Sequence, residues 1–133
     1  MVRVFATQVC GDTILVYEMT NGEAGWGAAV RLAPDGALRW SYEIPGFNIG
    51  HPLVEGDRLY LSAFGFLAGL SLKSGRTVWL HENLYESDTN SFVGFDVPIV
   101  GMDLIYYREI YKSEPRALRT YAVDRLTGNL SEP

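Results

Sequence analysis

The chain has 133 residues, of which 47% are hydrophobic and 20% are charged, and this balance excludes a disordered or low-complexity protein. Sixteen acidic against eleven basic residues give a net charge of −5. That charge argues against a nucleic-acid-binding protein, because such proteins need a basic surface. The single cysteine, Cys10, excludes an internal disulfide framework and a cysteine zinc site.

The amino-terminal residues 2–9 form the first expected strand, and they lack the long apolar core and cleavage site of a signal peptide. No later segment approaches the roughly 20 apolar residues that cross a bilayer. Together with the unpaired Cys10, these features predict a cytoplasmic protein with no membrane partner.

Three glycine turns, each feeding a strand, divide the chain into similar units. Gly11, Gly56 and Gly101 follow one another at a spacing of 45 residues, and each is followed by an aspartate and a run of apolar residues. Regular spacing of this kind indicates an internal repeat. The predicted units cover residues 1–46, 47–90 and 91–133. Strands are also expected before each glycine, over residues 2–9, 49–54 and 92–100.

A second glycine turn lies inside each unit, at Gly36, Gly75 and Gly128. Trp40 and Trp79 follow the first two of these glycines by four residues, and Glu132 stands at that position in the third unit. A glycine hairpin turn sets the register of its two strands. We therefore expect each tryptophan on the buried face of the last strand of its unit.

Apolar and polar residues alternate in the remaining segments, most clearly over residues 38–44 and again over residues 57–64 and 104–111. This two-residue period gives a strand one buried and one solvent-exposed face. No longer window has the apolar spacing of a helix. The sequence therefore predicts an all-β protein of antiparallel sheets.

Residues 68–79 resemble the signature of the PQQ-like (quinoprotein-type) β-propeller repeat, which ends in a glycine turn and a tryptophan. Residues 121–128 match its first eight positions closely, and residues 30–40 match more loosely. The resemblance implies three antiparallel four-stranded propeller-like blades, with each tryptophan and glycine turn helping neighbouring blades to dock. Ordinary propellers have four to eight blades. Three blades therefore allow three arrangements: an open or partial propeller, a six-bladed ring closed by two chains, or sheets repacked as a sandwich.

The same resemblance suggests a quinone cofactor, but we expect none. Quinoproteins enclose the quinone in a complete ring and commonly place a disulfide of adjacent cysteines against it, which three repeats and one cysteine cannot reproduce. His51 and His81 lack clustered carboxylates, so we expect hydrogen-bonded histidines at turns or strand ends and no metal site. Cys10 is expected to be a small buried residue at a strand end.

Aspartate recurs after the first glycine of each unit, at Asp12, Asp57 and Asp103. We interpret these three carboxylates as turn caps that accept backbone N–H groups, and not as acid–base catalysts. With no nucleophile beside a histidine and an orienting acid, the chain is not expected to be an enzyme.

One segment, residues 81–96, combines acidic and aromatic residues without a basic one. Acidic groups steer a basic partner and aromatic side chains anchor it. The alternative is a solvated connection whose aromatic residues fold back into the core. The candidate partner-binding residues are Glu82, Tyr85, Glu86, Asp88, Phe92, Phe95 and Asp96.

These observations favour a non-catalytic protein-binding domain with a basic protein partner, in one version a small acidic inhibitor or immunity protein that neutralises a basic toxin or enzyme. A second hypothesis is a small-ligand binder or enzyme whose site lies at the centre of a homodimeric six-bladed ring, where His51 and His81 of the two copies approach the central channel. A third is a structural domain of a larger assembly.

Overall fold

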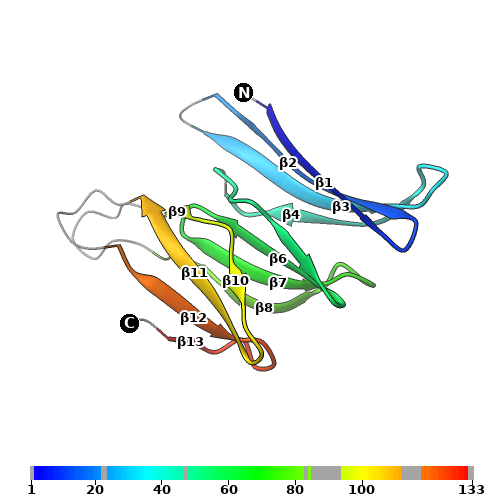
Figure 1. Ribbon diagram of the computed structural model, residues 1–133. Helices are drawn as coiled ribbons and strands as arrows, with labels where there is room; N and C mark the ends of the chain where they lie inside the picture. Colours follow the sequence, from blue (N-terminus) through cyan, green and yellow to red (C-terminus); the bar gives the residue numbers. More distant parts are fainter. Residues whose placement is uncertain are drawn as a thin grey trace.

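A computed structural model describes residues 2–21, 24–46, 48–82, 84, 94–111 and 118–131. These residues form three antiparallel sheets that follow one another in chain order (Figure 1). The described part of the chain contains no helix, and so none long and apolar enough to cross a membrane. The all-β prediction is confirmed.

Sheet 1 has the strand order β1-β2-β3-β4. Its strands are β1 (Val2–Val9), β2 (Asp12–Thr20), β3 (Gly25–Leu32) and β4 (Leu38–Ile44). Alternation explains its register, because Ile14 pairs with Arg31 and Arg31 pairs with Trp40, which places the tryptophan on the same face as Ile14. Both β1 and β4 have the expected bounds.

Sheet 2 has the order β5-β6-β7-β8, and sheet 3 has the order β10-β11-β12-β13 with β9 also paired to β11. The strands of sheet 2 are β5 (Leu53–Glu55), β6 (Arg58–Ala63), β7 (Phe66–Ser71) and β8 (Thr77–His81). Those of sheet 3 are β9 (Gly94–Phe95), β10 (Ile99–Val100), β11 (Leu104–Tyr111), β12 (Thr120–Asp124) and β13 (Leu130–Ser131).

The strands before the second and third glycines are shorter than predicted. The expected strand over residues 49–54 begins only at Leu53, because the backbone N–H groups of Ile49 and Gly50 bond to Glu18 and Ser62 as an irregular connection between sheets. The expected strand over residues 92–100 lies in part outside the described residues, and its remainder is interrupted between Phe95 and Ile99.

Two hydrophobic cores hold the three sheets together. The first lies between sheets 1 and 2 and includes Ile14, Trp40, Leu59 and Leu61. The second lies between sheets 2 and 3 and includes Tyr60, Trp79, Ile105, Tyr107 and Tyr121. Leu59 and Tyr60 are neighbours in one strand yet belong to different cores, so sheet 2 is buried on both faces and its central strand lacks polar alternation.

Trp40 and Trp79 each dock on the glycine turn of the next sheet. A methyl group added at Gly75 would lie 2.5 Å from Cδ2 of Trp40, and one added at Gly128 would overlap Trp79. Both glycines have positive φ angles, of 72° and 76°. The turn therefore needs glycine both for its backbone conformation and for the close approach of an indole ring.

Two predictions about the first turn are wrong. Cys10 is exposed, not buried, because it occupies the β1–β2 turn with φ of 50° and its side chain points to solvent. Asp12 does not cap that turn: it is buried and pairs with Arg31 and Arg39. At the equivalent turns of the other two units, the hydrogen bonds are made by the backbone. The carbonyl of Asp57 accepts the N–H of Leu72, and the carbonyl of Asp103 accepts the N–H of Arg125.

Candidate functional site

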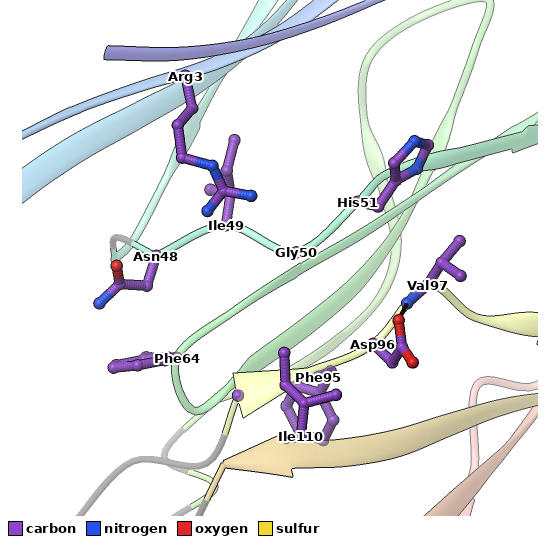
Figure 2. A pocket seen from close by; sticks show the side chains of 11 residues that line it. Arg3, Asn48, Ile49, Gly50, His51, Phe64, Phe95, Asp96, Val97 and Ile110 are labelled. Atoms are coloured by element: carbon purple, nitrogen blue, oxygen red, sulfur yellow. Dashed lines mark hydrogen bonds between the residues drawn. The ribbon is translucent and has the colours of Figure 1, made fainter. Parts of the chain in front are cut away.

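A cavity of about 420 Å³ lies where the innermost segments of the three sheets meet, and we call it the inner cavity (Figure 2). Strand β1, the connection before β5 and the residues around β9 all contribute to its wall. The side chains used in the argument below are Arg3, Asn48, His51, Phe64, Asp96 and Ile110.

Arg3 is positioned by strand β1 and is already paired. Its Nη1 lies 3.3 Å from Oε1 of Glu18, and its guanidinium lies over the ring of Phe5 at 5.4 Å from the centroid. Glu18 is fully buried, and its Oε2 accepts the backbone N–H of Ile49 at 3.0 Å. Because Glu18 balances the guanidinium, Arg3 contributes little uncompensated positive charge to the inner cavity.

His51 packs edge-on against Phe5, with ring centroids 4.9 Å apart. Its Nδ1 lies 2.8 Å from the carbonyl oxygen of Pro52. A carbonyl can only accept, so this contact places a proton on Nδ1 and leaves Nε2 for a ligand. His81 lies elsewhere: its Nε2 contacts the carbonyl oxygen of Gly128 at 2.6 Å, between sheets 2 and 3. The expectation that both histidines approach one central site is therefore wrong for His81.

Asp96 supplies the acidic group of the inner cavity. Its backbone N–H donates to the carbonyl of Arg108 at 2.9 Å, which ties the residue to β11. Its Oδ1 accepts the N–H of Val97 at 2.8 Å, and the carboxylate makes no ion pair with a described residue. The exposed Asp96 thus leaves a negative charge at the cavity wall, beside the apolar side chains of Phe64 and Ile110.

The predicted partner-binding residues divide into three groups. Glu82 and Asp96 are exposed, as a binding role requires. Phe95 is 2% exposed, packs edge-on against Tyr107 and Tyr121 and also lines the inner cavity, so it is a core residue and not an exposed anchor. Tyr85, Glu86, Asp88 and Phe92 lie outside the described residues.

Sequence reasoning missed Arg3, Asn48, Phe64 and Ile110 as cavity residues. The available signal was the repeat itself, because the segments before the first glycine of each unit must lie side by side if the three sheets pack in order. Among the described residues, no group of three or more histidine, cysteine, aspartate or glutamate side chains is arranged to hold a metal ion.

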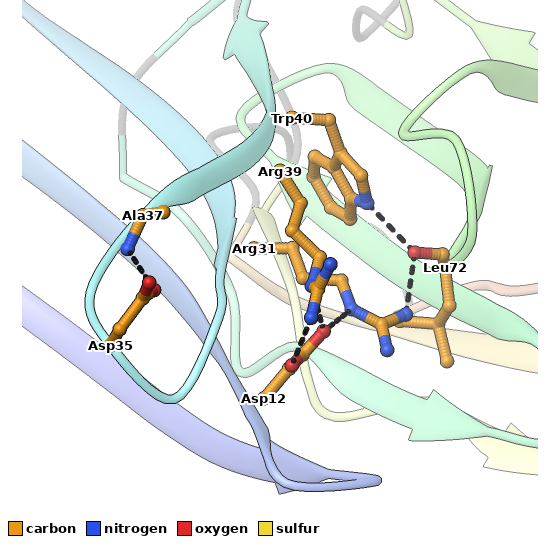
Figure 3. A network of polar contacts seen from close by, with 7 residues as sticks. All are labelled: Asp12, Arg31, Asp35, Ala37, Arg39, Trp40 and Leu72. Atoms are coloured by element: carbon orange, nitrogen blue, oxygen red, sulfur yellow. Dashed lines mark hydrogen bonds and ion pairs between the residues drawn. The ribbon is translucent and has the colours of Figure 1, made fainter.

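A second polar cluster lies at the other end of sheet 1 and is structural (Figure 3). Arg31 Nε and Arg39 Nε each lie 2.6 Å from Oδ2 of Asp12, and these two guanidinium groups, Arg39 foremost, lower the pKa of the Asp12 carboxyl. Arg31 also donates to the carbonyl of Leu72 at 2.9 Å, which accepts the indole N–H of Trp40 at 2.7 Å. The cluster therefore joins sheet 1 to sheet 2.

Stacked four-stranded antiparallel sheets, joined by a tryptophan on the next glycine turn, define a partial β-propeller of PQQ-like repeats. The sequence profile of the family described as outer membrane protein assembly factor BamB matches residues 3–132, and the chain belongs to this family. A search of curated protein sequences gives no significant match.

Two solved structures share the fold. The quinohemoprotein alcohol dehydrogenase from Comamonas testosteroni superposes with a TM-score of 0.68 at 14% identity, over 94% of this chain and 19% of that one. A europium-containing methanol dehydrogenase gives a TM-score of 0.65 at 13% identity, over 98% of this chain and 27% of that one. The chain thus spans about a fifth to a quarter of each enzyme, and at these identities the likeness concerns the fold alone.

Proposed function

We propose that this chain is a non-catalytic protein-binding domain whose inner cavity receives a basic side chain of a partner protein. The observation that carries the proposal is the Asp96 carboxylate, which makes no ion pair with a described residue and stands at the wall of a cavity that all three sheets line. Arg3 does not oppose a cation there, because its charge is balanced by the buried Glu18.

The walls of the inner cavity suit the stem of a lysine or arginine. Phe64 and Ile110 offer apolar surface, along which the methylene groups of a long basic side chain pack while its charged end meets a carboxylate. Asn48 and His51 add a side-chain amide and an imidazole Nε2 that suit the backbone of an extended segment.

The acidic segment supports the same choice of partner. Residues 82–96 carry Glu82, Glu86, Asp88 and Asp96 without a basic residue, within a chain of net charge −5. Such a concentration of one sign accelerates encounter with an oppositely charged protein and discourages acidic ones. In its most specific form the proposal is a small acidic inhibitor or immunity protein that neutralises a basic toxin or enzyme.

The test measures binding of a short labelled peptide of alternating lysine and phenylalanine by fluorescence anisotropy. Asp96→Asn retains an oxygen for the Val97 N–H but removes the charge, and we expect it to weaken binding about tenfold and to reduce the salt dependence. Asp103→Asn is the matched control, just before the far end of β11 and five residues, about 17 Å, from Arg108, to which Asp96 is bonded.

A peptide with glutamate in place of lysine should not bind. Equal affinity of the two peptides, or equal losses for Asp96→Asn and Asp103→Asn, would contradict the assignment of the inner cavity.

A further inference from the structure

The two outermost sheet faces of the molecule carry exposed apolar side chains and are not covered by any described strand (Figure 1). We call the side of sheet 1 that points away from sheet 2 the leading face, and the side of sheet 3 that points away from sheet 2 the trailing face. On the leading face, Val2 pairs with Met19 and Met19 with Trp26, which forms a continuous apolar row across three strands. Val4 and Tyr17 form the next row.

The repeat shows what such faces normally contact. Ile14 and Tyr60 occupy equivalent positions, because each lies two strands from the tryptophan of its own sheet. The neighbours of Tyr60, Leu59 and Leu61, are buried against sheet 1. The corresponding neighbours of Ile14, Thr13 and Leu15, lie on the leading face and are only half-buried. The leading face is therefore the type of surface that packs against a preceding sheet.

We propose that the leading face of one copy of this chain packs against the trailing face of a second copy, and that two copies close into a six-sheet ring. The trailing face supplies the matching apolar surface, since Ile99 is 69% exposed and pairs with Tyr106, which is 38% exposed. Arg108 also points outward on this face, and a guanidinium complements the edge-to-face pair of Tyr17 and Trp26 on the leading face.

The glycine turn of sheet 1 differs in length from the turn of sheet 2 that receives Trp40. Nine positions separate Arg31 from its partner Trp40, whereas ten separate Gly69 from Trp79, so the turn of sheet 1 is one residue shorter. Its hydrogen bonds differ accordingly, with Gly36 donating to Ala33 where Gly75 donates to Ser71. The shorter turn has no counterpart of Leu72, whose carbonyl accepts the indole N–H of Trp40.

The third unit also differs from the first two at the position of the tryptophan. Residue 132 is glutamate where the earlier units have Trp40 and Trp79, and a methyl group at Gly36 would meet nothing within 4 Å. The sequence of the third unit therefore supplies no tryptophan for the open turn at Gly36.

The available area is sufficient for a specific dimer. The four strands of sheet 1, with seven to nine residues each, cover roughly 19 by 26 Å, whereas those of sheet 3 have two, eight, five and two residues and cover about half that area. Two contacts in a ring, each burying surface on both copies, then reach the ~1,000 Å² that a biological interface needs. The contact is heterologous, because it joins two different faces. The assembly therefore stops at two copies only if the rotation that relates one copy to the next closes the ring. In a closed ring the inner cavities of the two copies would line one central opening.

The test is the mass of the chain at micromolar concentration, measured by size exclusion with light scattering and by sedimentation velocity. We expect twice the 14.8 kDa of one chain. Val4→Glu on the leading face and Tyr106→Glu on the trailing face should each yield monomers, while Leu126→Glu, at an exposed turn outside both faces, should leave the dimer intact. Circular dichroism is the folding control, and all three variants should retain the strand content of the wild type.

A mixture of Val4→Glu and Tyr106→Glu should regain dimers, because each variant keeps the face that the other lacks. If Val4→Glu were monomeric while Tyr106→Glu still formed dimers, the contact would join two leading faces, and this result would overturn the ring. A monomeric wild-type chain, or a mass that rises without limit with concentration, would overturn it as well.

Discussion

The two interfaces between sheets use the same tryptophan and glycine turn but different chemistry. Between sheets 1 and 2, the indole N–H of Trp40 donates to Leu72, and Arg31 joins the same carbonyl to Asp12 (Figure 3). Between sheets 2 and 3, the indole nitrogen of Trp79 is buried without a described hydrogen-bond partner. That ring packs instead among aromatic side chains, stacked on Tyr60 at 6.4 Å and edge-on to Tyr107 at 6.5 Å.

The difference shows which part of the repeat is essential for docking. The glycine turn and the flat indole ring are common to both interfaces, so shape complementarity defines the contact. The polar anchor is an addition found between sheets 1 and 2, where it fixes the direction in which Trp40 lies. Substitutions that separate shape from hydrogen bonding therefore test the comparison directly.

The largest effect is expected for removal of either tryptophan. Trp40→Ala and Trp79→Ala should each lower the free energy of unfolding by about 3–5 kcal/mol, because each leaves a large cavity between two sheets. Trp40→Ala should cost more, since it also removes the bond to Leu72. Chemical denaturation measures both values, and a loss below about 1 kcal/mol for either would contradict its place in the core.

Next in size is the addition of a methyl group at the glycine turns. Gly75→Ala and Gly128→Ala should each cost about 2–4 kcal/mol, the sum of left-handed backbone strain and collision with an indole ring. Gly36→Ala is the matched control, with φ of 88° and no atom within 4 Å of the added methyl. It should show the strain alone, about 1 kcal/mol, in thermal or urea unfolding. Equal losses at all three positions would mean that the rings do not restrict the turns.

A smaller and pH-dependent effect is expected for Asp12→Asn. Arg39 and Arg31 hold the pKa of the Asp12 carboxyl below its ordinary value of 3.8, so the folded state gains stability when this group is ionised. That gain is fully present above the unfolded-state pKa and disappears as the pH falls through the lower folded-state pKa. The wild type should thus exceed Asp12→Asn in stability at pH 7 and approach it below pH 3.8, as followed by urea unfolding at several pH values.

The smallest effect has the opposite sign. The hydroxyl of Tyr107 is buried and bonds to no described residue, and burial raises its pKa. Tyr107→Phe should therefore raise the free energy of unfolding by about 1 kcal/mol, because it removes an unsatisfied polar group. Tyr121→Phe is the contrasting variant, since the Tyr121 hydroxyl donates to the buried Glu109, and it should be destabilising. Calorimetry of the two variants distinguishes these outcomes.

Much of the fold was predictable because its determinants are local in the sequence. The glycine turns, the tryptophans four residues later and the strand over residues 38–44 follow from neighbouring residues and are found as expected. The alternation in that strand fails at Leu38, which is 60% exposed beside the register shift between Arg31 and Leu32. The ion pairs of Asp12 could not be predicted from the alternation within its own strand, because its partners Arg31 and Arg39 come from other strands. Phe95 was misassigned because a two-residue strand carries no periodicity.

The inner cavity was not predictable from any single segment. Arg3, His51 and Asp96 come from three different units, and their side chains share a wall only because the sheets pack in order. The predicted binding role of the acidic segment stays a prediction for Glu82 and Asp96, which are exposed.

The placement of each tryptophan on the turn of the following sheet has a consequence for biosynthesis. Sheet 1 is complete in its backbone once Ile44 is made, but the contact for Trp40 arrives only with Gly75. The same dependence links Trp79 to Gly128. During translation the nascent chain therefore carries an indole without its docking turn from Trp40 until Gly75 is made, and again from Trp79 until Gly128 is made.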